Sequence, residues 1–323
     1  MLKWLEMIIF FGSSQYSIPV LKKLLKARKD ILVITTKDKP AGRGKALTAN
    51  PLKKYAQEKN LETFCPENLD SISLKKLKEK FKTNFPSLGI CCVYGKIIPS
   101  SWLDSFSKGI LNVHPSLLPK YRGPSPAQFA ILKGEKTTGI SIIVMDSKVD
   151  HGPIVFQKNY SISPQNTAND LFDDLFSLAA AKISDIVDKQ LAGKNKPKKQ
   201  NHSQASFTRQ IEKEDGFISL EAIKLAIAGK SIKAKLLPKI FRLANPKTKS
   251  FSPEIINQAR KAFSPWPGIY TKVELTRKGK VEERTLKILD TKINGKRLEI
   301  KTVQLESKNP VTFSQFCSAY QIF

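Results

Sequence analysis

The sequence predicts an α/β protein built on a doubly wound, Rossmann-like parallel sheet. Short apolar runs rich in β-branched residues, such as MIIFF and DILVITT, alternate with stretches in which apolar residues recur every three to four positions, as in SIPVLKKLLKAR. Strands that alternate with helices favour a parallel sheet, because each parallel connection must cross over the sheet. With 323 residues and 41% apolar content, the chain can bury one large core or two ordinary ones.

The elements of the first domain follow in order. Strands are expected at 7–12, 30–36, 87–93 and 109–113, helices at 17–28, 51–60, 74–82 and 99–106, and a Gly-rich loop at 37–50. The apolar runs 139–145 and 153–162 predict an added β-hairpin, and a long helix is expected at 167–193. Gly12 ends the first strand, but the turn lacks the G-x-G-x-x-G pattern, so the sequence does not favour NAD binding.

The polar, basic stretch KNKPKKQNHSQ has the composition of a linker. We therefore predict a first domain over 1–192, a basic linker over 193–205 and a second domain over 206–323. No apolar run near the start approaches the ~20 residues needed to cross a bilayer, so a cytoplasmic protein without a membrane contact is expected. The four cysteines follow no metal-ligand or disulfide spacing, and a packing role is expected for them.

The net charge of +27 is unevenly distributed. Residues 1–60 carry 13 Lys and Arg against 4 Asp and Glu, residues 91–180 carry 8 against 7, and residues 182–301 carry 28 against 12. A solvated, Lys-rich surface explains part of this excess. The basic flanks around a nearly neutral centre also indicate a polyanionic partner, for which nucleic acid is the first candidate.

Polar residues stand where the fourth predicted strand ends. Asn112 and His114 are two positions apart, so they point to the same side of that strand. Ligands of doubly wound sheets bind outside the carboxyl ends of the strands. The hairpin loop adds Asp146, Asp150 and His151. A strand-end Asn is more often a turn former, and a lone His more often a satisfied core residue, but the combined spacing favours a site.

These motifs resemble a known family. NVHPSLLPKYRGPSP, followed by DHGPI, is similar to the signature of the 10-formyltetrahydrofolate-dependent formyltransferases. The segments PAGRGKA, CPENL, CCVYGKIIP, EKEDGFI and PWPGIYT narrow the resemblance to the branch that acts on initiator methionyl-tRNA for translation initiation. The resemblance implies an enzyme that uses a folate formyl donor; a monomer is expected, and the transfer needs no metal.

The resemblance also implies roles for single residues. The catalytic Asn, His and Asp of the family fall on Asn112, His114 and Asp150. The residues expected to line the folate pocket are Tyr94, Gly95, Ser116, Leu117, Leu118, Pro119 and Asp146, and those expected to contact RNA are Arg43 and Lys45. Tyr94 could equally be a core residue. Asp146 and Asp150 could both be hairpin-turn residues, and Asp150 is preferred as the catalytic one because it precedes Gly-Pro-Ile.

The chemistry of formyl transfer requires groups of these types. An α-amino group titrates near ~8 and must lose a proton before it attacks, which a carboxylate such as Asp150 can accept through a water. Attack builds negative charge on the formyl oxygen, for which the Asn112 amide and His114 are suitable donors.

Beyond the PWPG motif the chain departs from the family pattern. Three strand-like runs remain, at 269–275, 284–290 and 297–306, so a reduced OB-like barrel capped by 312–320 is expected. Two other functions stay open. A sugar-nucleotide formyltransferase could share the same three residues, and a non-catalytic RNA-binding protein could share the charge.

Overall fold

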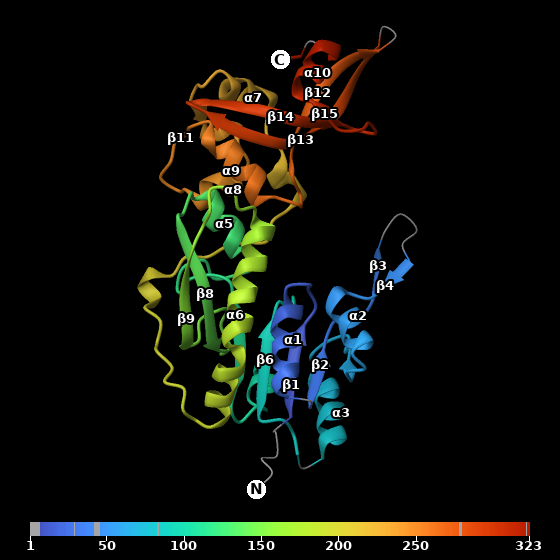
Figure 1. Ribbon diagram of the computed structural model, residues 1–323, viewed down its shortest axis with the longest axis vertical. Coiled ribbons are helices and arrows are strands. Elements are labelled where there is room, and N and C mark those ends of the chain that lie inside the picture. Colours follow the sequence, from blue (N-terminus) through green and yellow to red (C-terminus); the bar gives the residue numbers. More distant parts are fainter. Residues whose placement is uncertain (1–6, 29, 42–45, 83, 278–279, 321) are drawn as a thin grey trace. The chain divides into compact units, whose positions relative to one another are not determined.

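The computed structural model describes residues 7–28, 30–41, 46–82, 84–277, 280–320 and 322–323. The chain forms two compact units, whose elements are labelled in Figure 1. The first unit comprises Met1–Gly123, Thr137–Ser161 and Phe172–Phe207, and the second comprises Pro124–Lys136, Ile162–Leu171 and Thr208–Phe323. The units are thus interleaved in sequence. The domain boundaries at 192 and 205 stay predictions.

The first unit contains a seven-stranded sheet in the order β5-β2-β1-β6-β7-β8-β9. Its strands are β1 (Ile8–Gly12), β2 (Ile31–Ile34), β5 (Thr63–Phe64), β6 (Leu88–Cys92), β7 (Ile110–His114), β8 (Thr137–Val144) and β9 (Ile154–Ser161). The first five strands in this order are parallel, and β8 and β9 continue the sheet as an antiparallel hairpin. The predicted parallel sheet with an added hairpin is confirmed, and β5 is an edge strand that the sequence analysis missed.

The helices of the first unit are α1 (Ser17–Ala27), α2 (Pro51–Glu58), α3 (Ser71–Phe81), α4 (Ser100–Leu103) and most of α6 (Ala168–Leu191), with the 3₁₀ turn η1 (His202–Gln204). Among them, side chains cap the first turns of α2 and α3. The Asn50 side chain accepts from the Lys53 N–H at 3.0 Å at the start of α2. Asp70 and Ser73 form a reciprocal capping box on α3. Such caps satisfy amide groups that a helix leaves without internal partners.

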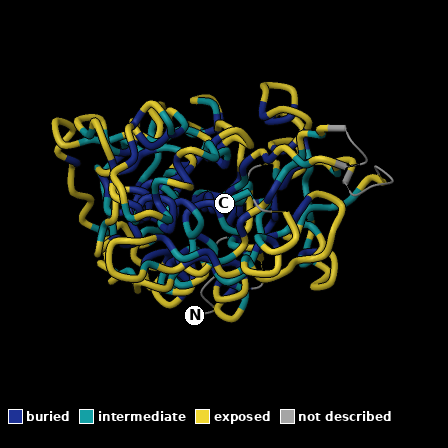
Figure 2. Tube along the Cα trace, turned by 90° about the horizontal axis from the view of Figure 1, so that it is seen from above, coloured by how far each residue is buried: buried dark blue, intermediate teal, exposed yellow. Residues whose placement is uncertain are grey.

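The core of the first unit follows the two-residue period of its strands. Ile9 and Phe11 of β1 face one cluster of buried side chains, which includes Trp102 and Phe106. Phe11 meets Trp102 edge to face, with ring centroids 6.1 Å apart. In Figure 2, buried segments lie toward the inside of the molecule and exposed segments toward the outside. The buried sheet is therefore a rigid support for residues at the ends of its strands.

The second unit is a small antiparallel β domain with helices. Its elements are α5 (Pro126–Leu132), η2 (Lys213–Gly216), α7 (Leu220–Ile227), β10 (Ile232–Lys233), η3 (Ala234–Leu236), α8 (Lys239–Ala244), β11 (Ser250–Phe251), α9 (Glu254–Ala262), β12 (Ile269–Arg277), β13 (Lys280–Asn294), β14 (Arg297–Leu305), β15 (Val311–Thr312) and α10 (Phe313–Tyr320). The strands β12, β13, β14 and β15 pair in that order. The three predicted strands are confirmed, the segment predicted as a cap at 312–320 contains helix α10, and β15 is an additional strand.

Helix α5 of this unit was not predicted from the sequence. No helix was expected between the strand at 109–113 and the hairpin at 139–162, but residues Pro126–Leu132 are helical and pack against α8 and α9. The Asn245 amide donates to the Leu132 carbonyl at 3.4 Å at this contact. The helix has only seven residues and follows a proline-rich loop. So short a segment does not show a clear 3.6-residue period of apolar residues, which is why the sequence did not predict it.

None of the helices in the described ranges is long and apolar enough to span a membrane.

Cys91 and Cys92 are buried on β6, and burial raises the pKa of the Cys91 thiol to about 12. The expected packing role fits this placement.

Candidate active site

Three polar side chains meet at the carboxyl end of β7. Asn112 donates from Nδ2 to Oδ1 of Asp150 at 3.0 Å. His114 is the last residue of β7, and its Nδ1 lies 3.4 Å from Oδ2 of Asp150. The structure thus brings together the three residues that the sequence analysis grouped, at the edge of the sheet where ligands of such folds bind.

Asp150 lies in a constrained turn between β8 and β9. Its φ is +48°, a left-handed conformation that Asp and Asn tolerate better than most residues. Two positions later, a side chain on Gly152 would lie 1.8 Å from the Val144 carbonyl oxygen, so only glycine fits. Oδ2 of Asp150 also accepts from the Gly123 N–H at 2.8 Å. The carboxylate is therefore held through both of its oxygens.

The imidazole of His114 is buried, with 4% of its surface exposed. Its Nε2 lies 3.0 Å from the Tyr121 carbonyl oxygen. Because a carbonyl only accepts, this contact assigns a proton to Nε2. The other nitrogen, Nδ1, is the one that faces Asp150, so the imidazole and the carboxylate can share a proton between them.

The loop after β7 is tied to the β8–β9 hairpin. Ser116 donates from Oγ to the Lys120 carbonyl at 2.7 Å. The N–H of Leu118 donates to the Ser141 hydroxyl at 3.1 Å, and its carbonyl accepts from Gln157 at 2.9 Å. Leu117 occupies the space beside Gly139, and a cis peptide joins Leu118 to Pro119. The predicted folate residues of this loop are thus fixed in place, and their contacts with folate stay predictions.

Tyr94 and Gly95 follow β6, the neighbour of β7. The Tyr94 ring belongs to the core cluster and meets Phe11 edge to face, with centroids 5.7 Å apart. Burial raises the pKa of its hydroxyl. Gly95 has a φ of +79°. The structure therefore places Tyr94 as the core residue that the sequence analysis considered as an alternative, and the folate role of this pair stays a prediction.

Asp146 pairs with a different residue from Asp150. Its Oδ2 lies 2.6 Å from Nδ1 of His151. The His151 ring stacks on His202, with centroids 4.0 Å apart and 6° between the planes. Loss of hydration lowers the pKa of His202, and the charges of His151 and Arg122 lower it further. Over the described parts of the chain, no group of three or more His, Cys, Asp or Glu side chains could hold a metal ion.

The stretch predicted as a linker contains residues that the sequence analysis missed. Lys198 pairs with Ile154 through two backbone hydrogen bonds, of 2.8 and 2.9 Å. Gln200 is buried beside the turn that carries Asp150. Arg122 donates to Gln200 at 2.6 Å and lies 2.8 Å from Nδ1 of His202. The Lys-rich composition around Gln200 is that of a solvated segment, so no sequence signal marked it.

Arg43 and Lys45, the predicted RNA contacts, lie outside the described residues. The strands on either side, β3 (Lys39–Ala41) and β4 (Ala46–Thr48), pair in antiparallel fashion. The segment predicted as a loop therefore carries two short strands. The RNA contacts stay predictions.

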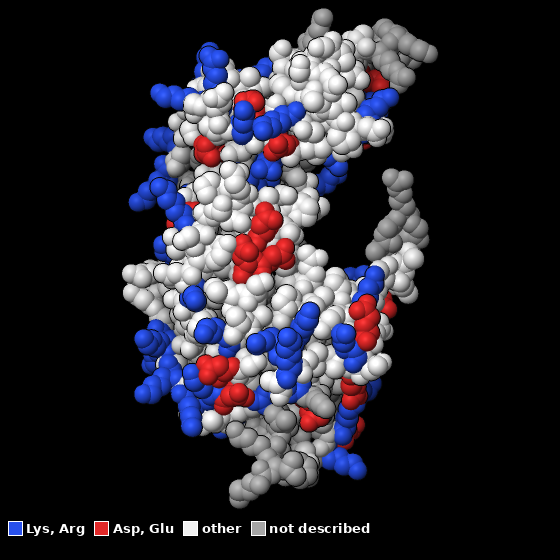
Figure 3. Space-filling view, in the orientation of Figure 1, with Lys and Arg blue, Asp and Glu red and all other residues white. Residues whose placement is uncertain are grey.

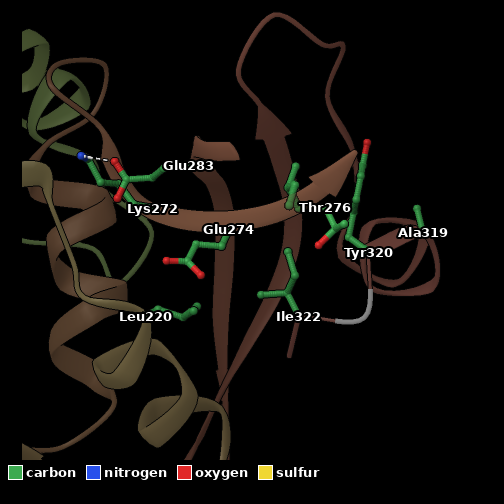
Figure 4. Close-up of a pocket in the computed structure, with 9 residues that line it drawn as sticks. Leu220, Lys272, Glu274, Thr276, Glu283, Ala319, Tyr320 and Ile322 are labelled. Atoms are coloured by element: carbon green, nitrogen blue, oxygen red, sulfur yellow. Dashed lines mark hydrogen bonds and ion pairs between the residues drawn. The ribbon is translucent and has the colours of Figure 1, made fainter. Parts of the chain in front are cut away.

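A separate cavity of about 500 Å³ lies within the second unit (Figure 4). Its wall includes Lys272, Glu274 and Glu283 from β12 and β13, with Leu220, Tyr320 and Ile322 around them. Lys272 and Glu283 form an ion pair of 2.5 Å. Of the described residues predicted for the site, none lines this cavity.

Comparison with known proteins defines the class of this fold and site. Residues 6–187 match the family model described as formyl transferase. The chain therefore belongs to the formyl transferase family.

Relatives within this family carry a more specific name. The methionyl-tRNA formyltransferase of Chloroflexus aurantiacus is 34% identical over 82% of this chain and 75% of its own length. The enzyme of the same name from Listeria innocua is 34% identical over 89% of this chain and 81% of its own length. The one from Thermodesulfovibrio yellowstonii is 40% identical over 66% of this chain and 68% of its own length.

Solved structures share the fold at lower identity. The methionyl-tRNA formyltransferase of Clostridium thermocellum has a TM-score of 0.56 and 18% identity, over 94% of this chain and 100% of its own. An N-formyltransferase of Helicobacter canadensis, in complex with folinic acid and dTDP-3-aminofucose, has a TM-score of 0.60 and 18% identity, over 90% of this chain and 88% of its own. At these identities the likeness concerns the fold.

Proposed function

We propose that this chain transfers the formyl group of 10-formyltetrahydrofolate to the α-amino group of initiator methionyl-tRNA. The observation that carries the proposal is the Asp150 carboxylate, which is held between the Asn112 amide and the His114 imidazole. The identity to methionyl-tRNA formyltransferases over most of the chain supports the choice of substrates. The tetrahydrofolate donor and the tRNA are substrates that bind at this edge of the sheet.

The three side chains divide the chemistry of the transfer. The amine nitrogen bonds to the formyl carbon, and the bond from that carbon to the folate nitrogen breaks. Asp150 accepts the proton that the amine loses, directly or through a water, and the folate nitrogen takes up a proton as it leaves. Asn112 uses one amide N–H for Asp150, so its second N–H can donate to the formyl oxygen. His114 is the second donor proposed for that oxygen.

The basic surface supports a nucleic-acid partner. Figure 3 shows Lys and Arg side chains spread over the face in view, with several clusters of Asp and Glu between them. The charge is thus not confined to one patch on this face. Contacts between Lys or Arg and phosphates need little geometric precision, so a distributed basic surface is sufficient for tRNA. Arg43 and Lys45 are proposed to contact the acceptor end.

One other acceptor is worth testing. The Helicobacter canadensis structure contains an amino sugar nucleotide, and its fold is similar to this one. The three sequence relatives described above, all named methionyl-tRNA formyltransferase, are nevertheless 34–40% identical to this chain, whereas the Helicobacter canadensis protein shares its fold at 18% identity, as does the solved methionyl-tRNA formyltransferase. The identity therefore favours tRNA as the acceptor.

A direct assay of both acceptors tests the proposal. The full chain is incubated with 10-formyltetrahydrofolate and initiator methionyl-tRNA, elongator methionyl-tRNA or dTDP-3-aminofucose in parallel. We expect rapid formylation of initiator methionyl-tRNA, weaker formylation of the elongator and none of the sugar. Formylation of the sugar alone would contradict the proposal.

A further inference from the structure

We infer that Gln200 is a positioning residue for Asp150, and that it acts through the backbone of the turn that carries this carboxylate. The inference rests on the role proposed above for Asp150. Gln200 is 6% exposed, although its neighbours Lys199 and Asn201 are exposed. A buried amide within an exposed basic stretch requires local partners, because an unpaired buried polar group is costly.

The partners of Gln200 are the two carbonyls that bracket His151. Its Nε2 donates to the Asp150 carbonyl at 2.9 Å and to the Gly152 carbonyl at 2.7 Å. The two N–H groups of one amide are thereby both used on one turn. These bonds hold the two carbonyls on either side of His151, directly after Asp150, whose φ is +48°. A left-handed residue persists only when its surroundings hold it there.

The position of Gln200 is itself set from two sides. Two backbone hydrogen bonds pair Lys198 with Ile154, which brings the residue two positions later opposite Gly152. On the other side, the buried Arg122 donates from Nη2 to Oε1 of Gln200 at 2.6 Å. The next residue, Gly123, donates its N–H to the Asp150 carboxylate. One connected set of hydrogen bonds therefore holds both the backbone and the carboxylate of Asp150.

The substitution Gln200→Glu tests this role selectively. Glutamate keeps the size of the side chain and its acceptor for Arg122, but an ionised carboxylate has no donor for the two carbonyls. We expect kcat to fall by about 10- to 100-fold, because small displacements of a catalytic group cost that much. KM for each substrate should stay near its wild-type value, since Gln200 binds neither.

Gln190→Glu is the matched control. Gln190 also donates from Nε2 to a backbone carbonyl, that of Lys108 at 2.8 Å, and accepts from Asn195 at 2.8 Å. It lies on α6, outside the hydrogen-bond set around Asp150. We expect this variant to keep wild-type kcat while losing a similar amount of thermal stability. Equal kcat values for the two variants would overturn the inference.

A second comparison separates positioning from a general structural effect. Gln200→Glu is combined with Asp150→Asn, which removes the proton acceptor but keeps a residue that tolerates positive φ. If Gln200 acts through Asp150, the double variant should be no slower than Asp150→Asn alone. A further loss equal to that of Gln200→Glu alone would contradict the inference.

Amide hydrogen exchange tests the inference independently of the assay. In the resting full chain, Gln200→Glu should accelerate exchange over residues 149–153, and Gln190→Glu should not. Unchanged exchange there would overturn the role of Gln200 even if the enzyme were active. Conversely, accelerated exchange in a chain that formylates nothing would support the positioning contact and reject the proposed function.

Discussion

The amide of Asn112 donates to the carboxylate of Asp150 at 3.0 Å, although 38 positions of sequence separate the two residues. The contact joins the end of β7 to the turn of the β8–β9 hairpin, which continues the same sheet. It is the point at which the fold creates a site.

Substitution of the two donors should slow the chemical step. We expect Asn112→Ala and His114→Ala each to lower kcat by about 100-fold or more, because each removes a donor proposed for the formyl oxygen. Single-turnover formylation measures the effect, and thermal unfolding checks the fold. Asn159→Ala, on an exposed position of β9, is the control. A donor variant as fast as this control would remove that residue from the mechanism.

A folate should stabilise the first unit. We expect 5-formyltetrahydrofolate at 100 times its Kd to raise the free energy of unfolding by about 2.7 kcal/mol. The full chain is used, because residues 124–136 and 162–171 belong to the second unit. In a fragment that ends at residue 205, these two segments would lose the rest of the unit against which they pack. Hydrogen exchange should show the protection over residues 114–120. If only amides of the second unit were protected, the folate would bind there and not at the proposed site.

Basic residues of the second unit should contribute to tRNA binding through charge. Lys233 and Lys235 are exposed, and we expect the double Lys→Gln variant to raise KM for tRNA. The log–log salt dependence of binding should flatten by ~0.7 to 0.9 for each phosphate that the variant no longer neutralises. Lys75 and Lys76, equally exposed on α3 of the first unit, provide the control pair. If the Lys75/Lys76 double variant changed KM and the salt dependence by the same amount as the Lys233/Lys235 variant, the second unit would not contribute more to tRNA binding than the first.

The buried thiols should resist alkylation in the native state. Because the pKa of Cys91 is raised to about 12, its thiolate is a very small fraction of the total at pH 8, and only the thiolate reacts. Brief iodoacetamide labelling followed by mass spectrometry should modify Cys317 before Cys91. The rate at Cys91 should rise on unfolding, where its pKa returns to the ordinary range. Fast native labelling of Cys91 would contradict its burial.

Local patterns predicted most strands of the sheet and the strand-end position of Asn112 and His114, whereas the choice of Asp150 over Asp146 rested on the resemblance to the family. The apolar run before Asn112 and the turn residues around Asp150 mark a strand end and a hairpin loop, and both features lie where the local sequence places them. The short edge strand β5 and helix α5 were missed, since two and seven residues leave no clear period.

Contacts between distant segments could not be predicted in the same way. Gln200 lies in a stretch whose Lys-rich composition is that of a solvated linker, and its burial depends on Arg122 and on the turn at Gly152. From the sequence, Tyr94 could be a pocket residue or a core residue. Only the packing of Phe11 against its ring distinguishes the two.

The rate of formyl transfer by Asp150→Asn tests the central claim most directly. Asparagine keeps the shape and the positive φ of the residue but cannot accept the proton of the amine. Single-turnover formylation of initiator methionyl-tRNA should be slower by about 100-fold or more than in the wild-type chain, with thermal unfolding unchanged. A variant that folds normally and formylates at the wild-type rate would show that Asp150 is not the proton acceptor.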